Sequence, residues 1–202
     1  MRYDVPINKR VVAFFDCQNL FKFSRNLWGY SYPNFDPIKL AQTITVKYSD
    51  DQWKLEKINL YTGLHARTRN PEWHEFWNRK LLNHKTADTR VSYFTTPLRY
   101  ANGIPREKGV DIRIALDLVR MARKNEYDVA LLFSQDNDFA EVAQEIREIS
   151  TEYGRWIKIV SAYPYESGFD LRGVDRTDWI PIPRVDYDAC IDRTDYRYPP
   201  IR

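Results

Sequence analysis

The sequence predicts a three-layer α/β/α fold, with helices on both faces of a central, mainly parallel sheet of about five strands. Short apolar runs, typical of strands that are buried on both faces, alternate along the chain with segments of helical periodicity. The clearest run covers residues 129–133 and stops at Ser134, with Asp136 and Asp138 directly behind it. Alternation of strand and helix is what a parallel sheet with crossover helices requires.

Composition favours one folded domain. The chain has 202 residues, of which 43% are hydrophobic and 15% aromatic, so it can bury a full core. Its net charge of +3 neither requires nor excludes a nucleic-acid partner. Cys17 and Cys190 form neither a disulfide framework nor a zinc-binding spacing. No apolar run approaches the roughly 18 residues of a membrane span, and residues 1–6 lack a signal core, so we expect a cytoplasmic protein.

Five strands and five helices are expected before residue 163. The strands cover residues 10–15, 55–62, 90–95, 127–134 and 156–162. The helices cover residues 21–27, 37–47, 71–84, 108–125 and 137–148. Asp36 is expected to cap the second helix, because Pro37 then occupies the first helical position, and Pro71 opens the third helix. Gly29 ends the first helix and Gly63 the second strand.

The helix over residues 108–125 has the clearest periodicity. Ile112, Leu116 and Val119 form one apolar row, and a second row widens it. The members of the second row are Ile114, Leu118 and Met121. Residues 17–20 read as a polar turn, and residues 96–107 read as a loop.

The pattern weakens after residue 163. We therefore expect one domain over residues 1–163 and an extension over residues 164–202 that packs on it and is partly irregular. Residues 179–182 read as a short edge strand, because Pro181 cannot donate a hydrogen bond within a sheet. Residues 187–191 read as one helical turn, and residues 192–202 as a loose tail. Three roles are open for the whole segment over residues 163–202: it covers a sheet edge, mediates a homodimer or closes over a substrate.

Four aspartates are expected at one edge of the sheet. Asp16 ends the first strand, and Asp136 and Asp138 follow the fourth. In a doubly wound sheet these two strands commonly lie side by side, so their carboxyl ends converge. Asp111 lies in the first turn of the helix that leads to the fourth strand. Such an oxygen-only set suits Mg²⁺ or Mn²⁺, which can activate water and stabilise a phosphodiester leaving oxygen.

Other polar residues are candidates to support this site. Asn19 and Ser134 can orient a water or a phosphate, and Lys108 can contact a phosphate or an acid. Four arginines follow strand ends, where they form either a solvated rim or a phosphate-binding rim. They are Arg67, Arg69, Arg99 and Arg106.

Three short motifs follow one another along the chain. Residues 14–20 read F-F-D-C-Q-N-L, residues 108–111 read K-G-V-D and precede Ala115-Leu116-Asp117, and residues 134–139 read S-Q-D-N-D-F. They resemble the apolar run into D-x-x-N, the K-G-V-D helix and the S-G-D-S-D-F segment of NYN-domain proteins. These proteins are a branch of the PIN-like nucleases that includes the LabA-like group. The resemblance covers approximately residues 10–162.

The resemblance implies a PIN-like fold, metal binding at Asp16, Asp111, Asp136 and Asp138, and action on RNA, with single-stranded RNA as the expected substrate. Two departures from the family pattern place larger side chains beside the predicted metal. Gln135 replaces the usual glycine, and Cys17-Gln18 replaces a commoner Gly-Asn.

Structural roles compete with these functional ones. Asp136 or Asp138 can cap the helix that follows, and Asp117 lies about 240° round the helix from Asp111, which favours a salt-bridge role. Cys17 is expected to pack as a small residue rather than act as a nucleophile. Trp73 and Trp77 share a helix face, so core packing is expected and base stacking is the alternative. The histidines show no ligand spacing and read as surface or partly buried residues: His65, His74 and His84.

The sequence therefore predicts a Mg²⁺- or Mn²⁺-dependent endoribonuclease with four catalytic aspartates. One alternative is an RNA- or protein-binding regulatory module with the same fold and little or no turnover. Another is a phosphatase-type hydrolase, but this chemistry requires Asp-x-Asp after the first strand, and Asp16-Cys17-Gln18 lacks the second acid.

Overall fold

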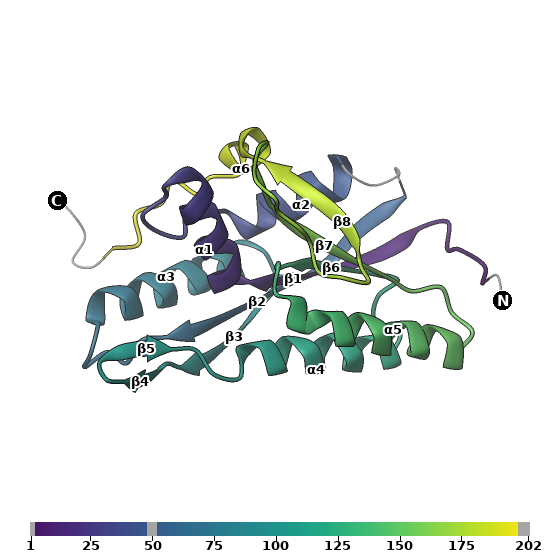
Figure 1. Cartoon of the computed structure of the whole chain (residues 1–202), viewed down its shortest axis with the longest axis horizontal. Coiled ribbons are helices and arrows are strands. Elements are labelled where there is room, and N and C mark those ends of the chain that lie inside the picture. The colour runs from purple at the N-terminus through teal and green to yellow at the C-terminus, as the bar shows by residue number, and fades with distance from the viewer. Residues whose placement is uncertain (1–2, 48–51, 198–202) are drawn as a thin grey trace.

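The computed structural model describes residues 3–47 and 52–197 and places them in three layers (Figure 1). The middle layer is a six-stranded sheet with the order β3-β2-β1-β6-β7-β8, and every neighbouring pair is parallel. The strands are β1 (Lys9–Asp16), β2 (Trp53–Leu64), β3 (Val91–Pro97), β6 (Val129–Phe133), β7 (Lys158–Tyr165) and β8 (Asp178–Pro183). The predicted fold is confirmed, and the expected edge strand near residue 180 is the sixth member of the sheet.

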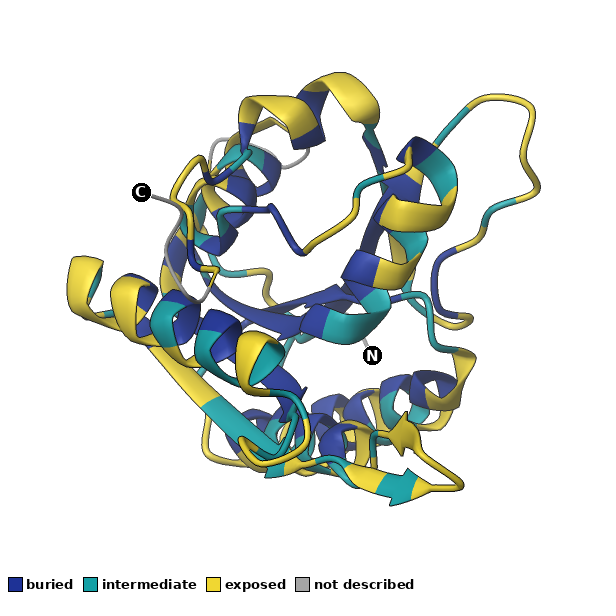
Figure 2. Cartoon of the chain, turned by 90° about the vertical axis from the view of Figure 1, so that its left-hand side faces the viewer, coloured by how far each residue is buried: buried dark blue, intermediate teal, exposed yellow. Residues whose placement is uncertain are grey.

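Helices cover both faces of this sheet (Figures 1 and 2). They are α1 (Cys17–Trp28), α2 (Pro37–Lys47), α3 (Pro71–Ala87), α4 (Val110–Arg123), η1 (Asn137–Phe139), α5 (Ala140–Glu152) and α6 (Arg184–Ala189). Phe15 and Leu131 face the core under α1, α2 and α3, whereas Phe14 and Leu132 face the core under α4 and α5. Strands buried on both faces explain the uninterrupted apolar runs. None of the described helices is long and apolar enough to cross a membrane.

The pairing of β1 with β6 determines where a ligand can bind. Phe15 lies opposite Phe133 in this parallel pair, as expected for the first and fourth predicted strands. The chain runs outward from β1 to β2 and β3 on one side, and from β6 to β7 and β8 on the other. The loops after β1 and β6 therefore diverge, and open α/β sheets bind ligands in the crevice at such a point.

Two segments differ from the prediction. The expected loop after β3 contains an antiparallel hairpin of β4 (Arg99–Ala101) and β5 (Ile104–Arg106). The hairpin lies beside the N-terminal end of α4 (Figure 1). Residues 17–20, expected as a turn, are helical, because the Asp16 carboxylate accepts a hydrogen bond from the Asn19 amide and caps α1 at once.

Helix α4 faces the core with a different row from the main row predicted. Ile114 and Leu118 are fully buried, whereas Ile112 and Leu116 are 64% and 52% exposed. The two rows are about 200° apart round the helix, so only one of them can face the sheet. The buried row starts at Val110, which places Asp111 at the edge of the sheet.

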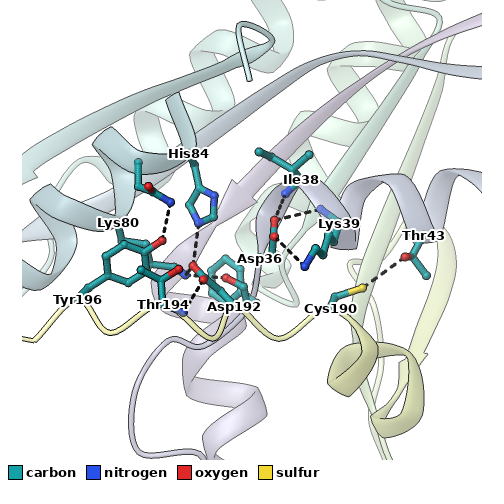
Figure 3. Close-up of polar contacts among 12 residues, drawn as sticks. Asp36, Ile38, Lys39, Thr43, Lys80, His84, Cys190, Asp192, Thr194 and Tyr196 are labelled. Atoms are coloured by element: carbon teal, nitrogen blue, oxygen red, sulfur yellow. Dashed lines mark hydrogen bonds and ion pairs between the residues drawn. The ribbon is translucent and has the colours of Figure 1, made fainter. Parts of the chain in front are cut away.

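A buried ionic contact joins the C-terminal segment to α3 (Figure 3). The ammonium of Lys80, only 2% exposed, donates to the Phe35 carbonyl at 2.7 Å and to Asp192 at 3.0 Å. His84 Nε2 lies 3.2 Å from the same carboxylate oxygen. His84, expected at the surface or partly buried, is only 4% exposed, and Tyr196 is 5% exposed. The expectation of a loose tail is therefore wrong for residues 192–196, and residues 198–202 lie outside the described part of the chain.

Candidate active site

A cavity of about 380 Å³ opens where the chain leaves β1 and β6. Four acidic side chains contribute to its lining: Asp16, Glu107, Asp111 and Asp136. The other lining residues are Gln18, Asn19, Lys22, Pro105 and Arg106. Three of the four predicted aspartates therefore meet at one cavity, and sequence reasoning missed its fourth acid, Glu107.

Asp16 is the most buried acid of the cavity, with 3% exposure. One of its oxygens accepts a hydrogen bond from the Asn19 amide at 3.0 Å, and the other lies 3.4 Å from the Ser134 hydroxyl. Burial raises the pKa of Asp16 to about 7; the Asn19 amide opposes this rise, and the charges of Asp111 and Asp136 add to it. The site therefore holds a carboxylate in surroundings that disfavour its negative charge.

The loop after β6 is fixed to α1 by hydrogen bonds. The Asn19 side-chain oxygen accepts from the Gln135 amide at 2.9 Å, and the Ser134 hydroxyl accepts from the Asp136 amide at 3.1 Å. The Asp136 carboxylate accepts from the Asp138 amide at 3.0 Å and so caps η1. The predicted capping role is confirmed for Asp136. Asn19 and Ser134 act on the backbone that positions the acids.

Asp111 and Asp138 form the outer part of the acidic group. Asp111 lies in the first turn of α4, and burial, then the charges of Asp136 and Asp138, raises its pKa. Asp138 is exposed and does not line the cavity, but its negative charge contributes to the raised pKa of Asp111. Asp117 contacts Arg113 at 2.8 Å and Arg120 at 3.2 Å, which confirms its salt-bridge role.

Glu107 enters the cavity because Gly63 has no side chain. A Cβ atom at Gly63 would lie 2.3 Å from a Leu98 methyl carbon and 3.1 Å from Glu107 Oε1. That oxygen is buried and has no hydrogen-bond partner within the described residues. Burial raises the pKa of Glu107 to about 7, and the charges of Asp16 and Asp111 add to the rise. The only signal for Glu107 in the sequence is its position as an acid directly before the K-G-V-D segment.

The cations at this cavity differ from those predicted. Lys22, which was not predicted, lines the cavity, and its positive charge opposes the rise in the pKa values of Asp16, Glu107 and Asp111. Of the predicted basic residues, only Arg106 lines it. The others lie outside the lining, and Arg67 is held by Glu75 at 3.1 Å. They are Arg67, Arg69, Arg99 and Lys108.

The two departures from the family motifs leave the cavity largely open. The Gln135 amide donates to the Arg172 carbonyl at 2.9 Å and is not part of the cavity lining. Cys17 is 1% exposed and packs in the core beneath α1, and burial strongly raises its pKa, so it is no nucleophile. Gln18 does line the cavity, with its amide 3.3 Å from the Thr62 hydroxyl.

The donor set suits a hard divalent cation. Carboxylate oxygens are the ligands that Mg²⁺ and Mn²⁺ prefer, and the unpartnered Glu107 oxygen is a free acceptor beside Asp16. Across residues 3–47 and 52–197, however, no three His, Cys, Asp or Glu side chains are grouped closely enough to hold one ion. Metal binding by the four predicted aspartates therefore stays a prediction.

A parallel α/β sheet with acids gathered at the carboxyl ends of its central strands defines a nuclease-like domain of the PIN type. The NYN domain profile matches residues 10–168, and the chain belongs to the NYN domain family. A crystal structure of a protein of unknown function from Vibrio parahaemolyticus is similar in fold, with a TM-score of 0.57 and 16% identity over 91% of this chain and 98% of that one. The comparison with curated proteins finds no match.

Proposed function

We propose that this protein is a divalent-metal-dependent ribonuclease that hydrolyses phosphodiester bonds of RNA, with Mg²⁺ or Mn²⁺ as the cofactor. The main support is the cavity at the end of β1 and β6, where burial and mutual repulsion raise the pKa values of Asp16, Glu107 and Asp111. Repelling carboxylates in a partly closed cavity are stabilised by a cation. Membership of a nuclease-like family agrees with this chemistry.

Each residue has a role in this proposal. Asp16, Glu107, Asp111 and Asp136 would hold the cation, which supplies water activation and charge neutralisation at the phosphate. Asn19 and Ser134 hold the backbone around these acids through the hydrogen bonds to Gln135 and Asp136. Lys22 and Arg106, at the cavity wall, would attract and orient the polyanionic substrate. Asp138 would influence the site through its charge.

Substitution of Asp136 tests this function. The protein is expected to cleave single-stranded RNA in Mn²⁺ and to lose this activity in EDTA. Asp136→Asn keeps the oxygen that caps η1 but removes the charge, so cleavage should disappear while the fold persists. The matched control is Asp117→Asn, because this acid belongs to the Arg113 and Arg120 ion pairs away from the cavity. Cleavage by Asp136→Asn at the wild-type rate in a gel assay would refute the proposal.

Glu107→Gln is expected to weaken Mn²⁺ binding. The amide retains the size of the side chain but cannot supply a charged oxygen to the cation. We expect the dissociation constant, measured by isothermal titration calorimetry, to rise about tenfold or more. Glu148→Gln is the control, since this glutamate lies on exposed α5 surface, where it accepts from Gln144. An unchanged constant in Glu107→Gln would remove this residue from the proposed metal site.

A second candidate function is an RNA- or protein-binding module with little or no turnover. One observation favours it: Asp16 and Asp136 each use an oxygen to cap a helix, so part of the acidic set has a structural use. This function predicts RNA or protein binding without cleavage of RNA in Mn²⁺ or Mg²⁺.

A further inference from the structure

Three aromatic rings lie together beside the acidic cavity, and we call them the aromatic platform: His65, Trp73 and Tyr100. The Tyr100 hydroxyl lies 2.9 Å from His65 Nδ1, and the centroids of the His65 and Trp73 rings are 6.5 Å apart. His65 follows β2, Trp73 begins α3 and Tyr100 belongs to the hairpin. Three separate segments thus bring their rings to one place.

The platform adjoins the cavity on two sides. Tyr100 lies opposite Pro105 in the hairpin, and Pro105 and Arg106 line the cavity. On the other side, the Trp73 ring lies 6.2 Å from the ring of Phe21, the residue before cavity-lining Lys22. A chain of nucleotides bound across the cavity would therefore pass beside the platform.

Positive charge surrounds these rings. The Arg69 guanidinium lies 5.4 Å from the centroid of the Tyr100 ring, and the Arg25 guanidinium lies 5.7 Å from that of Phe21. Lys22 and Arg106 line the adjoining cavity together with the acids. Burial, then the charge of His74, lowers the pKa of His65, so its ring is neutral at neutral pH and the positive charge comes from the arginines and Lys22.

Burial distinguishes the platform from the aromatic core beneath it. Phe76 and Trp77 of α3 are buried, at 5% and 1% exposure, and pack against the sheet. Trp73, His65 and Tyr100 are only half-buried. Core packing accounts for Phe76 and Trp77 and for one side of Trp73, but His65 and Tyr100 belong to neither core cluster.

We propose that the aromatic platform binds an unpaired base of RNA by stacking, while the adjoining phosphodiester lies at the acidic cavity. This inference rests on the proposed ribonuclease function and deepens it, since it names the surface that would cause the expected preference for single-stranded RNA. Every base has a π-face, so recognition by stacking tolerates different sequences. Bases of a duplex are already stacked on their neighbours and cannot reach the platform.

Binding of a fluorescein-labelled single-stranded RNA, followed by fluorescence anisotropy in EDTA, tests the platform without cleavage. Tyr100→Ala should raise the dissociation constant about 5- to 150-fold, the range that loss of one stacked base produces. Tyr100→Phe keeps the ring and should bind nearly as wild type does. The matched control is Tyr93→Ala. Tyr93 also lies on a strand, and the Lys85 ammonium lies 5.5 Å from the centroid of its ring, but Tyr93 does not line the cavity.

Two arginines of one loop provide a second comparison. Arg69→Ala should weaken RNA binding, whereas Arg67→Ala should have a smaller effect, because Glu75 already neutralises Arg67.

Binding of duplex RNA should not distinguish Tyr100→Ala from wild type. Wild-type affinity of Tyr100→Ala for single strands, an equal loss in Tyr93→Ala, or no RNA binding by the wild type would overturn the platform. Binding without cleavage would refute only the ribonuclease function.

Discussion

Asp16→Asn is expected to abolish RNA cleavage and, in the absence of metal, to stabilise the fold. The side chain is 3% exposed, and burial raises its pKa to about 7, so ionisation of this carboxyl opposes folding. Asparagine has the same shape and keeps an oxygen for the Asn19 amide, but it has no charge to bury. The loss of a charged ligand should reduce cleavage about a thousandfold, equivalent to about 4 kcal/mol of transition-state stabilisation.

The stability effect of Asp16→Asn has a defined pH dependence. The pKa of Asp16 is higher in the folded than in the unfolded protein, so wild-type stability falls as the pH rises from about 4 through about 7. We expect the variant to unfold at a higher temperature at pH 8 in EDTA, because its free energy of unfolding should exceed that of the wild type by on the order of 4 kcal/mol. Thermal melts at pH 5 and pH 8 measure this, and the gain should be smaller at pH 5.

Mn²⁺ should stabilise the wild type and not the variant. At one hundred times its dissociation constant, a ligand of the folded state adds about 2.7 kcal/mol. Asp128→Asn is the control at the opposite end of β6. Burial alone would raise the pKa of Asp128, but hydrogen bonds and charge from Arg10 outweigh it and lower the pKa, so this substitution should destabilise. Equal stabilisation of wild type and Asp16→Asn by Mn²⁺ would contradict the placement of Asp16 at the metal.

Positions at the ends of central strands could be predicted from the sequence. The apolar runs that end at Asp16 and Ser134 are recognisable because β1 and β6 are buried on both faces. Parallel strands then bring their carboxyl ends to one edge, so Asp16 and Asp136 had to be near each other. The same argument explains why the pairing of the first and fourth predicted strands could be expected without any knowledge of side-chain contacts.

Residues whose position depends on helix phase or on a hairpin could not be found in this way. Lys22 faces the cavity because α1 begins directly at Asp16, where a turn was expected. Glu107 reaches the cavity because the hairpin turns the chain back and Gly63 leaves space for its carboxyl. In α4, both apolar rows fit helical periodicity, and only packing against the sheet selects the one that contains Ile114.

Asp192→Ala is expected to have the largest effect on stability. The carboxylate pairs with Lys80, which is 2% exposed, and contacts His84, which is 4% exposed. Its removal leaves a buried ammonium that still donates to the Phe35 carbonyl but has lost the carboxylate with which it forms an ion pair. Loss of one partner of a buried ion pair costs about 3–5 kcal/mol. For a chain of this size, the melting temperature should fall by roughly 6–20 °C.

Replacement of both charged residues distinguishes the contribution of the ion pair to stability from that of the packing around it. The double variant Lys80→Met/Asp192→Leu removes the unpaired charge and should recover much of the stability lost in Asp192→Ala. Asp195→Ala is the control in the same segment, because its ion pair with Arg197 is exposed, and it should melt close to wild type. A double variant that is as unstable as Asp192→Ala would show that altered packing, and not the unpaired charge of Lys80, causes the loss of stability.

The pH dependence of Asp192→Ala follows from the carboxyl itself. Burial alone would raise the pKa of Asp192, but His84 and Lys80 outweigh it and hold the pKa well below its usual range. A carboxyl with a depressed pKa stabilises the fold fully above about pH 4, and this contribution declines as the pH falls further. The difference in melting temperature between wild type and Asp192→Ala should therefore be constant near neutrality and shrink below pH 4. A difference that grows as the pH falls would exclude an ionised Asp192 as the partner of Lys80.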